Sequence, residues 1–145
     1  MKTLQAGDKV PQFTAVDQNG DAISSVDWSG KKTIVFFYPK ANTPGCTLEA
    51  CNLRDHYQEL KEKGFQLIGV SADSSKKQKS FADKYELPFT LLADEDKTVI
   101  EAFGVWHKFH TLDFIEWSFN FVVLSGFVIE NPFFSLKSGK KIFFY

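Results

Sequence analysis

The pattern of apolar and polar positions divides the first two thirds of the chain into short strands and helices. Three apolar runs rich in β-branched and aromatic residues, 32–38, 65–72 and 89–93, have the length and composition of buried strands. Residues 13–23 predict a strand, a turn and a second strand, because Asn19-Gly20 is a favoured hairpin turn. The pattern therefore predicts five strands in residues 13–93.

Helical spacing fills the segments between these strands. It predicts helices at 46–63, at 75–85 and at 96–104. In the first of them Leu48, Leu53 and Leu60 fall on one face, and Gly64 ends the helix. Alternating strands and helices predict an α/β domain with a largely parallel sheet and right-handed crossovers.

The pattern changes after residue 106. Nine of the sixteen phenylalanines lie in residues 106–145, and amphipathic helix faces of the earlier kind are missing. Residues 119–130 predict a strand, a turn at Ser125-Gly126 and another strand. We expect a core at 1–106. The Phe-rich segment 107–145 is either a β-rich edge of the same domain or a tail that does not belong to the fold, for example from a changed reading frame.

Composition and charge narrow the class of protein. The length of 145 residues suits one domain. A net charge of −1 gives no basic excess for nucleic acid or an anionic membrane. No apolar run approaches the ~18 residues of a membrane span, and no secretory h-region follows the N-terminus. We therefore expect a cytoplasmic location, where a close cysteine pair is more typical of redox or metal chemistry than of a structural staple.

Candidate chemistry is concentrated in residues 39–53, PKANTPGCTLEACNL, which contain the two cysteines of the chain. Cys46 opens the predicted helix, where free backbone N–H groups and the helix dipole favour an anionic thiolate, the reactive form of cysteine. Thr43 brings a hydroxyl able to donate to a thiolate or a substrate oxygen. Pro39 follows the preceding strand, and its ring could shield the sulfur from water.

The spacing of Cys46 and Cys51 sets a geometric condition on any disulfide between them. Five residues along an ideal helix separate the Cα atoms by about 8.6 Å, whereas a disulfide needs about 4.4 to 6.8 Å. Pairing therefore requires the first turns of the helix to unwind. Two alternatives stay open: the cysteines are simply small buried residues, or they bind zinc. The zinc reading is weakened by a spacing wider than C-x₂₋₄-C and by the lack of a second ligand pair.

Pro39, Thr43 and Cys46 reproduce the Pro-x₃-Thr-x₂-Cys motif, and here the chain resembles the peroxiredoxins. Residues 36–55 are similar to the Q-type subfamily, the bacterioferritin comigratory proteins, and the resemblance extends over residues 3 to about 106. It implies a thioredoxin-like fold, with a central mixed β-sheet flanked by helices. It also implies that a monomer reduces hydrogen peroxide and organic hydroperoxides, with thioredoxin as the usual reductant.

The resemblance also implies a role for each residue of the motif. Cys46 is the peroxidatic cysteine, whose thiolate attacks the peroxide and becomes a sulfenic acid. Cys51 is the resolving cysteine, Thr43 orients the peroxide, and Pro39 shields the site. Sulfur carries both electrons, so no metal or organic cofactor is required.

The chain departs from the family at the arginine that peroxiredoxins bring from a later strand. Its one arginine, Arg54, lies upstream on the cysteine helix, and Lys108 cannot reproduce a planar, bidentate guanidinium. Losing such a charge near the reacting oxygens typically costs several kcal/mol of barrier. The alternative function is therefore a catalytically impaired relative that acts as a redox-sensitive thiol, or as an interaction protein through its Phe-rich segment.

Overall fold

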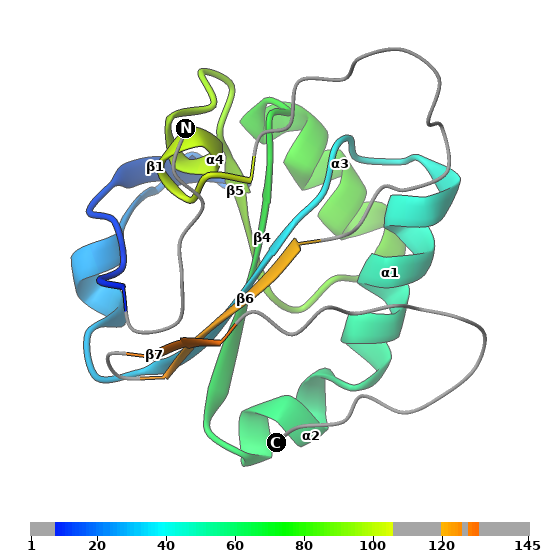
Figure 1. The fold of residues 1–145 in the computed structure, drawn as a ribbon. Coiled ribbons are helices and arrows are strands. Elements are labelled where there is room, and N and C mark those ends of the chain that lie inside the picture. Colours follow the sequence, from blue (N-terminus) through cyan, green and yellow to red (C-terminus); the bar gives the residue numbers. More distant parts are fainter. Residues whose placement is uncertain (1–7, 106–119, 126–127, 131–145) are drawn as a thin grey trace, which may run out of the picture.

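The computed structural model describes residues 8–105, 120–125 and 128–130, which build one sheet with helices on both faces (Figure 1). The elements in chain order are β1 (Thr14–Asp17), β2 (Ala22–Ser24), the 3₁₀ helix η1 (Ser25–Trp28), β3 (Lys32–Phe37), α1 (Pro44–Asp55), α2 (Tyr57–Glu62), β4 (Phe65–Ser71), α3 (Ser75–Tyr85), β5 (Thr90–Ala93), α4 (Thr98–Ala102), β6 (Asn120–Ser125) and β7 (Val128–Glu130).

The described strands lie in the order β2-β1-β5-β4-β3-β6-β7. The central pairs β3–β4 and β4–β5 are parallel, and all other described pairs are antiparallel. The mixed sheet that the resemblance implies is thus confirmed. The largely parallel sheet predicted from the alternation of strands and helices is wrong, because among the described strands only the two central pairs are parallel. The predicted strand–turn–strand at 119–130 is found as the antiparallel pair β6–β7, and β6 pairs with β3 from Thr33–Leu124 to Phe37–Asn120. Part of the segment 107–145 therefore belongs to the sheet.

Both faces of the central strand β3 are buried. Ile34 and Phe36 point into a cluster beneath α1, α2 and α3, whereas Val35 and Phe37 point into a second cluster beneath η1 and α4. Side chains of successive strand residues alternate between faces, so a strand covered on both sides reads as a continuous apolar run. Figure 1 shows α1 and α3 on one side of the sheet and α4 on the other.

The predicted helix at 46–63 is two helices in the structure, because α1 ends at Asp55 and α2 begins at Tyr57. The break falls at His56, whose backbone N–H and ring Nδ1 both lie within hydrogen-bond distance of the Asn52 carbonyl oxygen, at 3.2 and 2.9 Å. The predicted buried face was also wrong in part. Leu48 is 74 % exposed, and the face that meets the sheet contains Cys46, Ala50 and Leu53.

The other predicted helices agree with the structure within a few residues. α3 spans Ser75–Tyr85 as predicted, and the Ser74 hydroxyl accepts a hydrogen bond from the Lys77 N–H, as an N-cap does. α4 is shorter than the predicted 96–104, and the chain leaves it through Gly104, whose φ of +67° is in the left-handed region. α3 packs on the same face of the sheet as α1, which carries the cysteines, and α4 packs on the other face.

Candidate active site

Cys46 lies in the first turn of α1, at the end of the loop that leaves β3. Pro44 is the first residue of the helix. The first helical hydrogen bond runs from the Thr47 N–H to the Thr43 carbonyl oxygen, at 2.9 Å. Among the described residues, the backbone N–H groups of Gly45 and Cys46 have no hydrogen-bond acceptor. Free N–H groups at a helix N-terminus favour an anion, so this end of α1 suits a thiolate or a developing oxyanion.

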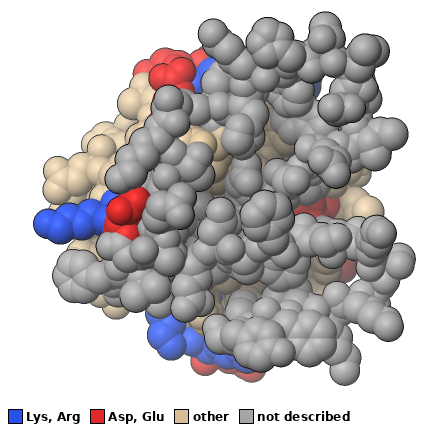
Figure 2. Space-filling view, viewed as in Figure 1, with Lys and Arg blue, Asp and Glu red and all other residues tan. Residues whose placement is uncertain are grey.

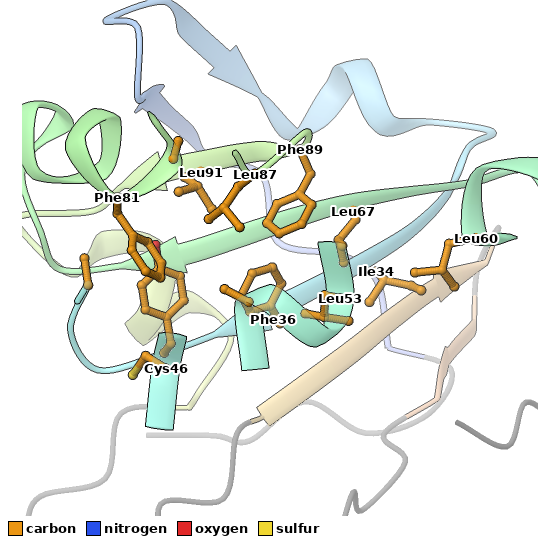
Figure 3. Close-up of a cluster of buried hydrophobic side chains, with 14 residues drawn as sticks. Ile34, Phe36, Cys46, Leu53, Leu60, Leu67, Phe81, Leu87, Phe89 and Leu91 are labelled. Atoms are coloured by element: carbon orange, nitrogen blue, oxygen red, sulfur yellow. The ribbon is translucent and has the colours of Figure 1, made fainter. Parts of the chain in front are cut away.

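The Cys46 side chain is 3 % exposed and belongs to the cluster between the sheet and α1, α2 and α3. Figure 3 shows Cys46 at one end of this cluster and Leu60 at the opposite end, with Phe36 between them. Phe81 of α3 extends toward the same end as Cys46. Cys46 is therefore buried in a cluster that includes aromatic side chains, whereas Pro44 and Gly45 of the same helical turn are exposed.

Thr43 and Pro39 both lie in the loop between β3 and α1, and both are half-buried. Thr43 is the N-cap residue of α1, but its side chain makes no capping bond. Its hydroxyl instead donates a hydrogen bond to the Lys40 carbonyl, at 3.1 Å. The hydroxyl proton is thus directed to the loop backbone, which leaves the oxygen lone pairs able to accept from an O–H group.

Cys51 lies on the same uninterrupted helix as Cys46, and both residues are free thiols. Cys51 is half-buried, whereas Cys46 is buried. The structure therefore has the intact, reduced helix that the sequence predicts, with a Cα separation of about 8.6 Å from ideal geometry. No disulfide fits this helix as it stands.

A buried network of polar side chains supports the loop, and the sequence analysis missed it. Asp73 accepts hydrogen bonds from the Ala41 N–H at 2.7 Å and from the Ser71 hydroxyl at 2.9 Å. Gln78 donates to the same Ser71 hydroxyl at 3.0 Å, and the Tyr38 hydroxyl donates to the Gln78 carbonyl oxygen. Burial raises the pKa of the Tyr38 hydroxyl, so it stays a hydrogen-bond donor at neutral pH.

Glu49, one helical turn after Cys46, is a buried acid that the sequence analysis also missed. Its side chain is 6 % exposed, and no hydrogen bond or ion pair to its carboxylate is found among the described residues. Desolvation by burial raises the pKa of Glu49 to about 7. A titratable group thus lies within the helical segment that separates the two cysteines.

Arg54 is engaged at the far end of α1. Its guanidinium donates to the Tyr85 carbonyl at 2.8 Å and pairs with Asp55 at 2.9 Å. It stands eight positions after Cys46 on the helix, an axial rise of about 12 Å. Arg54 therefore does not stand in for an arginine beside the Cys46 sulfur, and Lys108 lies outside the described residues.

Other kinds of site find no support in the described part of the chain. It contains no group of three or more His, Cys, Asp and Glu side chains placed to hold a metal ion. None of its helices has the length and apolar character that crossing a membrane requires. Figure 2 shows both acidic and basic side chains among the described residues that are visible on that face.

Comparison with known proteins identifies the protein family of the chain. The sequence pattern of the AhpC/TSA family matches residues 6–130, so the chain belongs to this family. The match extends beyond residue 106 and includes β6 and β7. Membership supports a thiol-dependent peroxidase activity.

The resemblance to peroxiredoxins of the Bcp and Q type is confirmed by individual relatives. The chain is 50 % identical to peroxiredoxin Bcp of Escherichia coli over 106 residues, which are 73 % of this chain and 68 % of that protein. It is 48 % identical over 99 residues to the chloroplastic peroxiredoxin Q of Sedum lineare, covering 68 % of this chain and 53 % of that protein. The crystal structure of BcpB from Mycobacterium tuberculosis superimposes with a TM-score of 0.77 at 33 % identity, over 88 % of this chain and 84 % of that one.

Proposed function

We propose that the chain is a Q-type peroxidase that reduces hydrogen peroxide and organic hydroperoxides through Cys46 and Cys51. The observation that carries the proposal is the position of Cys46 in the first turn of α1, where the N–H groups of Gly45 and Cys46 find no acceptor in the described part of the chain. The family supports the peroxidase class, and the two cysteines on one helix support the Q-type assignment.

In the first step the Cys46 thiolate attacks one oxygen of the hydroperoxide, and the O–O bond breaks. Sulfur gains a bond to oxygen and is oxidised to the sulfenic acid, while the other oxygen leaves as an alkoxide or hydroxide and takes a proton to become alcohol or water. Thr43, whose hydroxyl proton is directed to Lys40, accepts a hydrogen bond from the peroxide O–H and orients it. Pro39, a half-buried residue of the same loop, limits access of water to the sulfur.

In the second step the first turns of α1 unwind and Cys51 attacks the sulfenic sulfur. A disulfide forms and the sulfenic oxygen leaves as water, which prevents further oxidation of Cys46. A thioredoxin dithiol then reduces the disulfide and is itself oxidised, which restores both thiols. We place this cycle in the cytoplasm, in a monomer without metal or organic cofactor, since free thiols are stable in that compartment.

A second candidate is a redox-sensitive relative that forms the disulfide with little turnover. Arg54 favours this alternative, since the one arginine of the chain is held by Tyr85 and Asp55 at the far end of α1. In this reading Cys46 still reacts with peroxide, but slowly, because no guanidinium polarises the O–O bond. The Phe-rich segment 107–145 would then contribute an interface rather than catalysis.

Intact-mass analysis after a stoichiometric peroxide pulse tests the proposal. The proposed cycle predicts a loss of two hydrogen atoms with no added oxygen, and thioredoxin-coupled peroxide consumption that Cys46→Ser abolishes. Disulfide formation without coupled turnover would support the redox-sensitive relative. A mass that does not change after the pulse, in protein whose thiols are shown to be free, would refute both.

A further inference from the structure

We propose that Asp73 is a positioning residue for the oxidation of Cys46, acting through the loop between β3 and α1. The inference rests on the proposed function and adds to it a residue outside the cysteine motif. Asp73 is the second residue after β4 and is 7 % exposed. It lies far from the cysteine segment in sequence, yet one of its carboxylate oxygens bonds that loop.

The contact between Asp73 and the loop is a short, buried hydrogen bond. The Ala41 N–H donates to Asp73 Oδ2 at 2.7 Å, and Ala41 itself is 7 % exposed. Ala41 stands midway between Pro39 and Thr43, the two motif residues of the loop. A hydrogen bond to a carboxylate is about twice as strong as one between neutral groups, so this bond fixes the loop at its centre.

The carboxylate is in turn fixed from the sheet. The Ser71 hydroxyl donates to the same Oδ2 at 2.9 Å, and Lys77 Nζ lies 3.8 Å from the other oxygen, Oδ1. Ser71 accepts from the Gln78 amide at 3.0 Å, and that amide also donates to the Leu92 carbonyl at 2.8 Å. Ser71 and Gln78 are fully buried. The chain of bonds therefore joins the loop to β4 and β5, which are rigid parts of the central sheet.

A second connection reaches the start of the loop. Tyr38, the residue after β3, donates its hydroxyl to the Gln78 carbonyl oxygen and is 3 % exposed. Gln78 thus supports Tyr38 and Ser71 together, and Ser71 supports Asp73. The loop is held at Tyr38 and at Ala41, just before Thr43 and the first turn of α1.

This arrangement separates the two chemical steps. Oxidation of Cys46 needs Thr43 and the free N–H groups at one fixed distance from the peroxide, and a displacement of about 1 Å can cost roughly 100-fold in rate. Disulfide formation needs the first turns of α1 to unwind, so it does not depend on the loop being held. Loss of the Asp73 carboxylate should therefore slow the first step selectively.

Rapid-quench mass spectrometry of the full chain can measure both steps separately, with hydrogen peroxide as the probe. For Asp73→Ala we expect the second-order rate of Cys46 oxidation to fall roughly 10- to 100-fold, with the disulfide step unchanged or faster. Asp73→Asn keeps an oxygen acceptor of the same shape but loses the charge, so it should restore part of the rate. Asp83→Ala is the matched control, since it removes an exposed acid of α3 that pairs with Lys79.

Three outcomes would overturn the inference: a folded Asp73→Ala variant that oxidises Cys46 at the unmodified rate, equal slowing of both steps, or no rescue by Asn. If Asp73→Ala does not fold, Ser71→Ala removes one of the two donors to Oδ2 and should give a smaller fall in the oxidation rate alone. An unmodified chain that does not react with peroxide would refute the proposed function instead, before any variant is compared.

Discussion

Glu49 offers a test in which burial, charge and pH act on one side chain. It is 6 % exposed, and burial raises its pKa from the ordinary 4.5 to about 7. Glu49→Gln keeps the size of the side chain and removes the titration. The comparison of the two proteins across pH therefore isolates the cost of ionising this buried acid.

The sign follows from linkage between protonation and folding. Because the pKa of Glu49 is higher in the folded than in the unfolded chain, the folded state binds more protons between the two values. The stability that Glu49 contributes is complete below pH 4.5 and is lost as the pH rises through about 7. A pKa difference of this size implies a loss of about 2 to 3 kcal/mol between pH 5 and pH 8.

Urea denaturation at several pH values between 5 and 8 measures this loss. We expect the free energy of unfolding of the unmodified chain to fall by about 2 to 3 kcal/mol more than that of Glu49→Gln over this range. Glu59→Gln is the control: Glu59 is exposed and its pKa is lowered by Lys63, so this change should act weakly and in the opposite sense. Parallel pH profiles for the unmodified chain and Glu49→Gln would refute the reasoning.

The same burial bears on the proposed disulfide step, because Glu49 lies between the two cysteines in the segment that would have to unwind. Unwinding exposes its carboxyl to water, where it ionises at its ordinary pKa. The unwound form should therefore become more stable relative to the helical form as the pH rises. We expect the disulfide step to accelerate with pH more steeply in the unmodified chain than in Glu49→Gln, and equal slopes would contradict this.

Four further substitutions test the role of Cys51 and the packing of the core. Cys51→Ser should retain one oxygen on Cys46 after a peroxide pulse and proceed to higher oxidation states with excess peroxide, as intact mass can show. A Cys51→Ser protein that consumes the peroxide but carries no added oxygen would count against Cys51 as the resolving residue. Gly69→Ala should lower the free energy of unfolding by roughly 1 to 3 kcal/mol, because a Cβ there would lie 2.7 Å from both Leu91 and Phe36; an unchanged urea midpoint would show that these side chains yield freely. Leu48→Ala should change stability by less than about 0.5 kcal/mol, whereas Leu53→Ala, which empties a buried site, should cost about 2 to 5 kcal/mol; similar losses for both would contradict the burial of the two leucines.

The error at Leu48 shows why the strands were easier to predict than the face of α1. β3 is buried on both sides, so its apolar run is informative at every position. In α1 the sequence offered Leu48 and Leu53, but only Leu53 is buried, and the rest of the face that meets the sheet is Cys46 and Ala50. Small residues let a helix approach closely, and their weak apolar signal does not reveal which face is buried.

Buried polar groups were missed for a related reason. Glu49 and Gln78 are residue types that are mostly exposed, so a pattern-based prediction places them on the solvent side. Gln78 is buried because three partners from the sheet satisfy its amide: Tyr38, Ser71 and the Leu92 carbonyl. Such partners come from different strands, and no local pattern in α3 records them.

The cysteine motif was predictable because it is local, whereas its support depends on the topology of the sheet. Parallel pairing of β3 with β4 and of β4 with β5 brings the carboxyl ends of these strands to one edge, where Tyr38, Ser71 and Leu92 meet Gln78. The loop that carries Pro39 and Thr43 starts at that same edge. In the proposed cycle the Pro-x₃-Thr-x₂-Cys motif therefore indicates which atom reacts, but not how firmly that atom is held. If the loop is positioned as we infer, chains with the same motif should oxidise at rates that depend on the carboxylate at position 73.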